Sequence, residues 1–457
     1  MLKNKSYWTI LLVLVSVSSF GQLGTSSPYS FAGLGELKQN GFTQHAATGG
    51  ASIAQQSENS FTPNNPASLA SLKYTVFDIG AYMSMGRLST ESESANTRTG
   101  NLSHFAMAFP FETKRKMAMS FGLNQYSDVG YEIENRFNND TPSYYNILRG
   151  NGGIHRLFLG YGVQPIKGLN IGASVNYNFG SIQSAYAKIY PNTDARFSFS
   201  DETFFAYEGF DLDLGAQYTV YDSIRLARKK SVTLKHTLAG AFNTRSNLNG
   251  EGYRYSETFY GGDFDAGDPS TIDTIYYADN LKNVNQKPLS FSLGYTVSHG
   301  NKWSLSAEME RSMWSTIAPR DSISYRNNER YSLGFSIVPR PKYEEKGDFF
   351  GKVRYSAGLR YENLYYVFNN TPSTELGISF GLGLPIVKSV RIVEEKVAIV
   401  STINITLEYI KRGSTGLIQE DYFKIGLGLN LNDKWFTKRK YLSESLFDLH
   451  RNTFTPW

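Results

Sequence analysis

The chain has 457 residues, 41 of them glycine and none cysteine, with 14% aromatic and 19% charged residues. The lack of cysteine excludes disulfide bonds, cysteine-ligated zinc and a cysteine nucleophile in this chain. The formal net charge of +5 is small against 46 basic and 41 acidic residues, and no basic stripe accompanies it, so we expect no nucleic-acid partner. Many tyrosines, phenylalanines and glycines with few charges are typical of amphipathic strands joined by polar loops.

Residues 1–21 have the organisation of a secretory signal peptide. Lysines at positions 3 and 5 precede an apolar stretch over residues 7–17, and small residues stand before a cut at Gln22. The apolar stretch is shorter than the ~20 residues that a membrane-spanning helix needs. We therefore expect export and cleavage; the alternative is a retained membrane anchor.

The next segment, residues 22–72, does not alternate and is rich in small residues. Small side chains allow close packing of backbones, and Asn65 before Pro66 is typical of an N-cap followed by proline at the first helical position. The strands that follow predict a barrel with more lumen than inward side chains fill. We therefore expect this segment to form a hatch, or plug, inside the barrel. Its motif residues are Gly49, Gly50, Asn65, Pro66 and Ala67.

From residue 73 onward, apolar residues alternate with glycine, serine, asparagine and threonine. The clearest case is residues 169–180, where Leu169, Ile171 and Val175 share one face. Most such segments have about 9 to 11 residues, the length that a tilted strand needs to cross a bilayer. The fourteen predicted strands are 73–85, 102–110, 117–125, 155–164, 169–180, 210–220, 231–243, 288–298, 302–311, 330–338, 352–362, 374–384, 401–410 and 421–431.

The predicted connections alternate in length. Those over 86–101, 126–154, 181–209 and 244–287 are long and polar, whereas the intervening ones are mostly short. This asymmetry is typical of outer-membrane barrels, whose long loops are extracellular. The sequence thus predicts an all-β fold, a 14-stranded antiparallel transmembrane β-barrel over residues 73–431. The alternative is a soluble β-sandwich, against which the small polar residues of the inner face argue.

The last predicted strand ends in the pattern that outer-membrane barrels present to their assembly machinery. Its residues are Lys424, Gly426, Leu429 and Leu431. The tail over residues 432–457 contains Trp435, Phe436 and a basic run at 438–440. Aromatic and basic residues together suit the headgroup region, so we expect the tail at the periplasmic rim. The alternative is a disordered overhang.

The motif Asn65-Pro66-Ala67, the small-residue stretch before it and the fourteen strands together resemble the FadL family of outer-membrane transporters. Residues 27–35 and 431–440 are similar to uncharacterised FadL-like proteins of Bacteroidetes. The resemblance implies a hatch that plugs the barrel, a substrate held in an apolar pocket, and a sideways exit through the barrel wall. Related barrels of this fold serve type IX secretion, so the fold alone does not decide the function.

Several charged residues occupy the polar phase of their strands. A lipid-facing Arg or Lys costs about 2–4 kcal/mol at the bilayer midplane, so we expect these charges to face the lumen. There they would anchor the hatch or line a path for substrate or ions. They are Asp211, Asp213, Glu308, Glu310, Arg354, Arg360, Glu362 and Glu408.

Histidines, one Ser–His pair and three aspartates are the other candidates for site chemistry. Six histidines show no metal spacing, and Ser103 beside His104 is the one candidate catalytic pair, yet neighbouring strand residues point to opposite faces. Aspartates at 263, 265 and 268 could hold calcium, but a solvated loop is the simpler interpretation. We expect no enzyme activity, no cofactor and no metal. We expect seven tyrosines to face outward near the membrane interfaces: Tyr82, Tyr161, Tyr177, Tyr218, Tyr295, Tyr361 and Tyr409.

The primary functional hypothesis is passive transport of hydrophobic, fatty-acid-like small molecules through a hatch-gated lumen with a lateral exit. It predicts an apolar cavity between hatch and wall. The alternative is a non-transporting barrel that acts as a protein-interaction component of an outer-membrane complex such as type IX secretion, through the 244–287 loop or the 432–457 tail. The other expected partners are outer-membrane lipid, lipopolysaccharide and the barrel assembly machinery. The expected location is the bacterial outer membrane, with both termini in the periplasm.

Overall fold

The computed structural model describes residues 24–38, 41–112, 116–138, 140, 142–191, 196–226, 230–260, 270–318, 323–343, 347–368, 370–392, 395–414 and 416–435. The expected signal peptide, the three aspartates of the calcium alternative and the basic run of the tail lie outside these residues. Within them, no helix is both long enough and apolar enough to cross a membrane.

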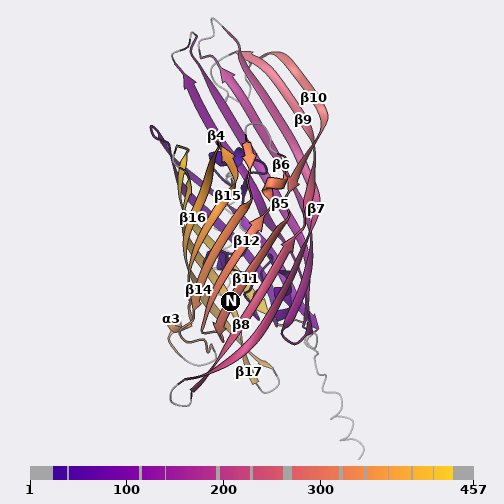
Figure 1. Ribbon diagram of the computed structural model, residues 1–457, viewed down its shortest axis with the longest axis vertical. Coiled ribbons are helices and arrows are strands. Elements are labelled where there is room, and N and C mark those ends of the chain that lie inside the picture. Colours follow the sequence, from indigo (N-terminus) through magenta and orange to yellow (C-terminus); the bar gives the residue numbers. More distant parts are fainter. Residues whose placement is uncertain are drawn as a thin grey trace, which may run out of the picture.

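Fourteen long strands close into an antiparallel barrel (Figure 1). The first and last of them pair along their whole length, from Thr75 opposite Asp433 to Ser89 opposite Gln419, which closes the sheet. This confirms the predicted fold. The barrel strands are β2 (Thr75–Ser89), β3 (Ser94–Glu112), β4 (Met117–Phe137), β5 (Tyr144–Ile166), β6 (Leu169–Ile189), β7 (Ser198–Leu226), β8 (Lys230–Asn243), β11 (Ser290–His299), β12 (Trp303–Ser312), β14 (Asn328–Ile337), β15 (Arg354–Phe368), β16 (Thr371–Ile392), β17 (Glu395–Gly413) and β18 (Gln419–Asp433).

A hairpin branches from the barrel wall between β8 and β11. Its strands are β9 (Ser246–Tyr260) and β10 (Ser270–Lys287), and β9 pairs with the first part of β7, whose second part pairs with β8. Strand β11 then pairs directly with β8, so the wall continues without the hairpin. In Figure 1, β9 and β10 stand with the extended ends of neighbouring strands above the rest of the rim.

The expectation of long polar loops at 86–101, 126–154, 181–209 and 244–287 is wrong. Most of those residues belong to strands, and β7 alone runs for 29 residues. Apolar alternation marks only the part of a strand that has one apolar face. Backbone pairing continues beyond that part in polar sequence, where the alternation signal disappears.

The outer face of the barrel is apolar. Leu159, Phe210 and Leu238 are 54%, 67% and 60% exposed, although each is paired with a residue of a neighbouring strand. The prediction that Tyr82 joins this outer face is wrong, because its hydroxyl donates to the backbone oxygen of Gly24 inside the barrel (2.9 Å). Tyr82 shares the phase of buried Asp78, whereas Met83 points outward and is 48% exposed.

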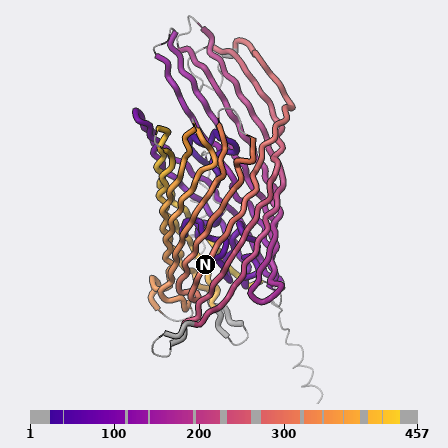
Figure 2. Tube along the Cα trace, viewed as in Figure 1, coloured from indigo at the N-terminus to yellow at the C-terminus, as the bar shows by residue number. Residues whose placement is uncertain are grey.

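The N-terminal segment, residues 24–72, lies within the ring of strands (Figure 2). It contains η2 (Pro28–Phe31), β1 (Glu36–Leu37), α2 (Thr43–Ala46) and η3 (Pro66–Ser71). Strand β1 pairs with β4, and η3 packs against β4, β5, β6 and β7. Three further short elements lie in connections of the barrel: η4 (Trp314–Thr316), β13 (Ile323–Tyr325) and α3 (Phe349–Lys352).

Candidate functional site: a charged lumen around the N-terminal segment

Small residues let the N-terminal segment touch the barrel wall. Gly49 has φ +66°, and a Cβ on Gly358 of β15 would stand 2.1 Å from the Gly49 nitrogen. Gly49 N–H also donates to Ser379 Oγ at 3.1 Å, and Gly50 next to it has φ +89°. Side chains at these positions would collide with the wall backbone or demand a strained conformation.

Asn65, Pro66 and Ala67 make the second close approach. Asn65 is fully buried; its side-chain oxygen accepts from Ala67 N–H at 3.1 Å, and its amide donates to the Ile53 carbonyl at 2.9 Å. A Cβ on Gly215 of β7 would stand 2.0 Å from that oxygen. The motif therefore caps η3 and seats it against the wall at the same time.

Glu308 of β12 holds the middle of the segment. Its Oε2 accepts from the backbone N–H groups of Ser52 (2.6 Å) and Ile53 (3.0 Å). Both amides lie outside a helix or strand, so without this carboxylate they would be buried donors lacking a partner.

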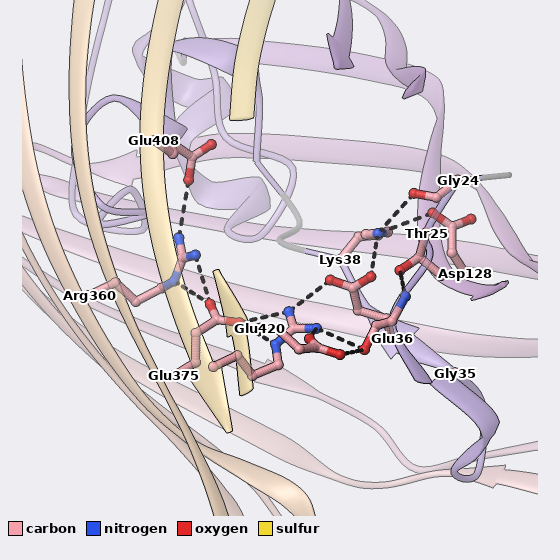
Figure 3. A network of polar contacts seen from close by, with 12 residues as sticks. Gly24, Thr25, Gly35, Glu36, Lys38, Asp128, Arg360, Glu375, Glu408 and Glu420 are labelled. Atoms are coloured by element: carbon pink, nitrogen blue, oxygen red, sulfur yellow. Dashed lines mark hydrogen bonds and ion pairs between the residues drawn. The ribbon is translucent and has the colours of Figure 1, made fainter. Parts of the chain in front are cut away.

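Arg412 is the centre of a buried charge network. Figure 3 shows its partners Glu36, Glu375 and Glu420 from close by. Its Nη2 donates to Glu36 of β1 (2.8 Å) and to Glu375 of β16 (2.7 Å), and its Nη1 donates to Glu420 of β18 (3.3 Å). Glu420 also accepts from Ser27 Oγ at 2.6 Å. One guanidinium thus ties two parts of the N-terminal segment to three neighbouring strands.

The network continues on both sides of Arg412. Arg360 of β15 pairs with Glu375 (2.8 Å) and Glu408 (3.4 Å), and Lys38 pairs with Glu36 (3.0 Å) and Asp128 (3.2 Å). Glu375, Glu408 and Arg360 are each at most 5% exposed. Charges this deeply buried are stable only when they are paired and hydrogen-bonded.

The pKa shifts of charged residues in the N-terminal segment agree with this ion pairing. Burial by itself would raise the pKa of Glu36, but Lys38 and Arg412 overcome it and hold that pKa well below its usual range. Burial likewise opposes the charge of Lys38, yet Glu36, Tyr82 and Asp128 raise its pKa well above the ordinary value. By contrast, burial lowers the pKa of His45 to about 3, so this imidazole is neutral.

A second polar cluster lies on the β6–β7 side of the lumen. Asp211 accepts from Lys287 Nζ (2.8 Å), Asn176 (2.7 Å) and Asn178 (2.5 Å). Asp213 lies 3.6 Å from Arg156 and accepts from Asn243 at 2.5 Å. The two aspartates are at most 3% exposed, and these five partners belong to long strands rather than to the N-terminal segment.

The remaining charges that the sequence assigned to the lumen have different surroundings. Glu310 pairs with Arg330, and Glu362 accepts from Asn328 Nδ2 at 3.0 Å. Arg354 donates to the side-chain oxygens of Gln44 (3.2 Å) and Asn404 (3.0 Å) rather than to a carboxylate.

Aromatic residues cover the segment at the rim from which the hairpin rises. Tyr365 donates its hydroxyl proton to the carbonyl oxygens of Ala32 and Gly35, both at 2.7 Å. Its ring stacks on Trp314 with centroids 4.1 Å apart, and Tyr29 stacks on Tyr366 at 5.2 Å. Aromatic side chains therefore fill part of the lumen at the rim that carries the hairpin.

A bulge in β3 brings Ser103 and His104 together, contrary to the expectation that they point apart. The register between β2 and β3 shifts beside Gly80, so Ser103 falls out of the ladder. His104 Nδ1 lies 2.9 Å from Ser103 Oγ, and its Nε2 lies 2.8 Å from Asp78. Phe42 of the N-terminal segment stacks on the imidazole at 4.6 Å, so this group also seats the segment.

The residues of the predicted assembly pattern do not share one face. Lys424 points inward, with its ammonium 4.3 Å from the centre of the Tyr82 ring, and Gly426 faces Thr43 and Thr406. Leu431 points outward and is 41% exposed, and Leu429 is partly buried. No group of three or more His, Cys, Asp or Glu in the described residues could hold a metal ion.

Three cavities lie around the segment, and charged side chains line each of them. The first, about 120 Å³, is bordered by Arg412, Glu375 and Lys424. The second, about 60 Å³, lies beside Phe42, His45 and Lys424. The third, about 460 Å³, opens at the rim with the short turns and contains Lys235, Lys302 and Arg354. None of these three is the apolar cavity that the transport hypothesis predicts.

Sequence reasoning missed the centre of the network. Arg412 and Glu420 lie just beyond the predicted ends of their strands, and Asp128 and Lys287 fell in predicted loops. Glu36 belongs to a two-residue strand and Lys38 follows it. A strand this short shows no periodic pattern in the sequence. Extending the alternation of β17 and β18 by one step would have placed Arg412 and Glu420 on the polar face.

Comparison with known proteins identifies the family. The family model described as BamG matches residues 1–442. The chain belongs to the BamG family. A search of curated proteins returned no match to this BamG-family chain.

Solved structures of similar fold include a FadL homologue, a hydrocarbon channel and a toluene transporter. A FadL homologue of Pseudomonas aeruginosa is 12% identical with a TM-score of 0.59, covering 88% of this chain and 100% of its own. The CymD monoaromatic hydrocarbon channel is 13% identical with a TM-score of 0.54, covering 88% and 98%. The P. putida toluene transporter TodX is 15% identical with a TM-score of 0.51, covering 87% and 99%. At these identities the likeness concerns the fold, which this BamG-family barrel shares with FadL-type channels.

Proposed function

We propose that the barrel crosses the bacterial outer membrane with its short turns in the periplasm and its tall rim outside. The apolar outer face supports this placement, since lipid favours an apolar surface on the barrel wall. A signal peptide over residues 1–21 would deliver the chain, and outer-membrane lipid and lipopolysaccharide would surround it. The residue pattern ending β18 would be read by the barrel assembly machinery.

In that placement the N-terminal segment acts as a fixed hatch, and the barrel serves as a protein-interaction component of an outer-membrane complex. The observation that carries this proposal is the charge network of Arg412, which joins Glu36 to β16, β17 and β18. Moving the hatch would separate buried charges from their partners, at a cost of roughly 3–5 kcal/mol for each broken pair. The charged lining of the three cavities also disfavours a path for hydrophobic molecules.

The β9–β10 hairpin offers a surface for such a partner. Ile272, Ile275, Tyr276 and Tyr277 are 42–62% exposed, and β10 pairs with β9 along most of its length. Exposed aromatic and aliphatic residues on a strand edge are favourable contact sites for another protein. A complex such as that of type IX secretion is one place for a barrel of this kind.

Purification from native membranes tests this proposal. The full-length protein should recover an outer-membrane partner in stoichiometric amount, and replacing residues 248–285 with a two-residue turn should abolish the recovery. Recovery of no stoichiometric partner by either form would refute the interaction role. A folded barrel is confirmed in both forms by heat-modifiable migration on gels.

A second candidate function is passage of hydrophobic small molecules, which the FadL-type fold favours. It would require the hatch to shift and a lateral exit to open, for which the bulge beside Gly80 is a candidate. Liposomes containing the purified barrel can be tested for uptake of a labelled fatty acid. Uptake above that of empty liposomes, lost when the hatch is cross-linked to β15, would favour this function over the first.

A further inference from the structure

The cavity of about 460 Å³ at the rim with the short turns differs from the others in charge. It lies between residues 55–59 of the N-terminal segment, the β11–β12 turn and the connection from β14 to β15. Among the described residues, its charged lining consists of Lys235, Lys302, Lys342 and Arg354 and one acid, Glu58. Glu58 pairs with Lys73 outside the lining, so it compensates Lys235, Lys302 and Arg354 only weakly.

Within this positively charged lining, Arg354 is the cation whose hydrogen-bond partners are described most fully. Both of its hydrogen bonds run from Nη2 to neutral amide oxygens, those of Gln44 and Asn404. No described carboxylate lies within ion-pair distance of Arg354, whereas Arg360 and Arg412 each pair with at least two. A partly buried guanidinium without a carboxylate is electrostatically incomplete, and a bound anion would complete it.

The rest of the lining suits a peptide. Aromatic contact area comes from Trp303, Tyr74 and Tyr343. Side-chain amides, which can bind a peptide backbone, come from Gln55, Gln56 and Asn59. The volume falls in the range of about 300–1,000 Å³ that is typical of sites for sizeable ligands. A single small carboxylate would leave most of this surface unused.

We propose that this cavity binds an acidic peptide segment of a partner protein. Carboxylates of the segment would face Lys235, Lys302 and Arg354, and its backbone would meet the amides of the N-terminal segment. The partner would be periplasmic if the proposed orientation holds, but binding itself does not depend on that orientation or on the hairpin.

The probe is a fluorescein-labelled hexaglutamate peptide, titrated against the full-length barrel in detergent at low salt. We expect saturable binding that weakens as ionic strength rises. Hexaglutamine should bind at least tenfold more weakly. Lys302→Gln, which changes an exposed residue of a turn, and Arg354→Gln should each weaken hexaglutamate binding by about tenfold, equal to ~1.4 kcal/mol.

The matched control is Lys388→Gln. Lys388 is an exposed lysine of β16 that pairs with Asp433 and lies outside the cavity lining, so its loss should leave the affinity unchanged. Equal losses in Lys388→Gln and Lys302→Gln would show nonspecific attraction and overturn the proposal. Free glutamate that competes at the same concentration as hexaglutamate would also overturn it, because the site would then be one for a small carboxylate.

Discussion

At the scale of single residues, buried ion pairs and close contacts of small residues hold the N-terminal segment against the barrel wall. Arg412 contacts carboxylates from three elements, and Glu308 satisfies two backbone amides. Surface ion pairs contribute little to stability, but removing one member of a buried network leaves its partners uncompensated. The network should therefore contribute most to the free energy that holds the N-terminal segment in the barrel.

Replacing Arg412 with methionine should destabilise the protein by roughly 3–5 kcal/mol, because Glu36, Glu375 and Glu420 remain buried without their cation. Guanidinium unfolding followed by tryptophan fluorescence measures the change. Arg136→Met is the control, since Arg136 belongs to an exposed pair and should cost under about 1 kcal/mol. A loss for Arg412→Met no larger than that of the control would contradict the role of the network.

Acidification should loosen the hatch through His45. Its folded pKa, about 3, is below the ordinary 6.5, so the unfolded segment binds a proton that the folded one excludes. Stability is therefore fully present above pH 6.5 and falls as the pH drops below it. At pH 5 the loss that His45 alone contributes should be about 2 kcal/mol. The lowered pKa of Glu36 changes stability only below its unfolded value of 4.5, so Glu36 contributes little to the change between pH 6.5 and pH 5.

Hydrogen exchange of residues 41–50 at pH 7 and pH 5 measures this effect. Wild type should exchange faster at the lower pH once intrinsic rates are corrected, and His45→Asn should lose most of that difference. An identical difference in both proteins would assign the pH response to another group.

At the scale of elements, the contact between the N-terminal segment and β15 is a backbone-to-backbone approach. A methyl group on Gly358 would stand 2.1 Å from Gly49 N, and the wall cannot yield because β14 and β16 flank it. Similar approaches seat η3 on Gly172 and Gly215. Glycines in these strands thus lie where the N-terminal segment packs too closely for a side chain.

Gly358→Ala should displace the segment while leaving the barrel closed, with a cost of about 1–3 kcal/mol for overpacking. Limited proteolysis of the folded barrel should then cut within residues 24–72, which we expect to be protected in wild type because most of their described side chains are buried. Gly347→Ala serves as the control, because no atom lies within 4 Å of the added methyl group. Unchanged protection in Gly358→Ala would show that the segment tolerates the methyl group.

At the scale of the whole molecule, closure depends on β2 and β18. Their ladder ends with Thr75 opposite Asp433, so the wall is complete before the tail begins. The hairpin of β9 and β10 stands outside this closed ring, because β8 pairs with β11 directly. Closure of the ring therefore does not depend on the hairpin.

Deleting residues 441–457 should leave the barrel folded, since every pair of the closing ladder lies upstream. Heat-modifiable migration on gels checks this outcome in membranes from cells that produce the shortened chain. Loss of the fast-migrating folded form after the deletion would mean that the tail is needed for folding.

Much of the fold follows from the sequence by itself. Alternation gave the number of barrel strands and their antiparallel order, because a wall with one apolar and one polar face imposes a period of two. The same phase argument led us to expect the charges at Asp211, Glu308 and Arg360 in the lumen. Proline after Asn65 predicted the capped helical turn that η3 forms.

Only the tertiary structure decided which charges meet and what fills the lumen. Arg412, Glu36 and Glu420 come from separate elements, and their contacts depend on the barrel closing around the N-terminal segment. Strand length beyond the apolar belt and the bulge at Ser103 are set by backbone pairing, which leaves no periodic trace in the side chains. The charge of the lumen, and with it the case for a fixed hatch, is a property of that three-dimensional arrangement.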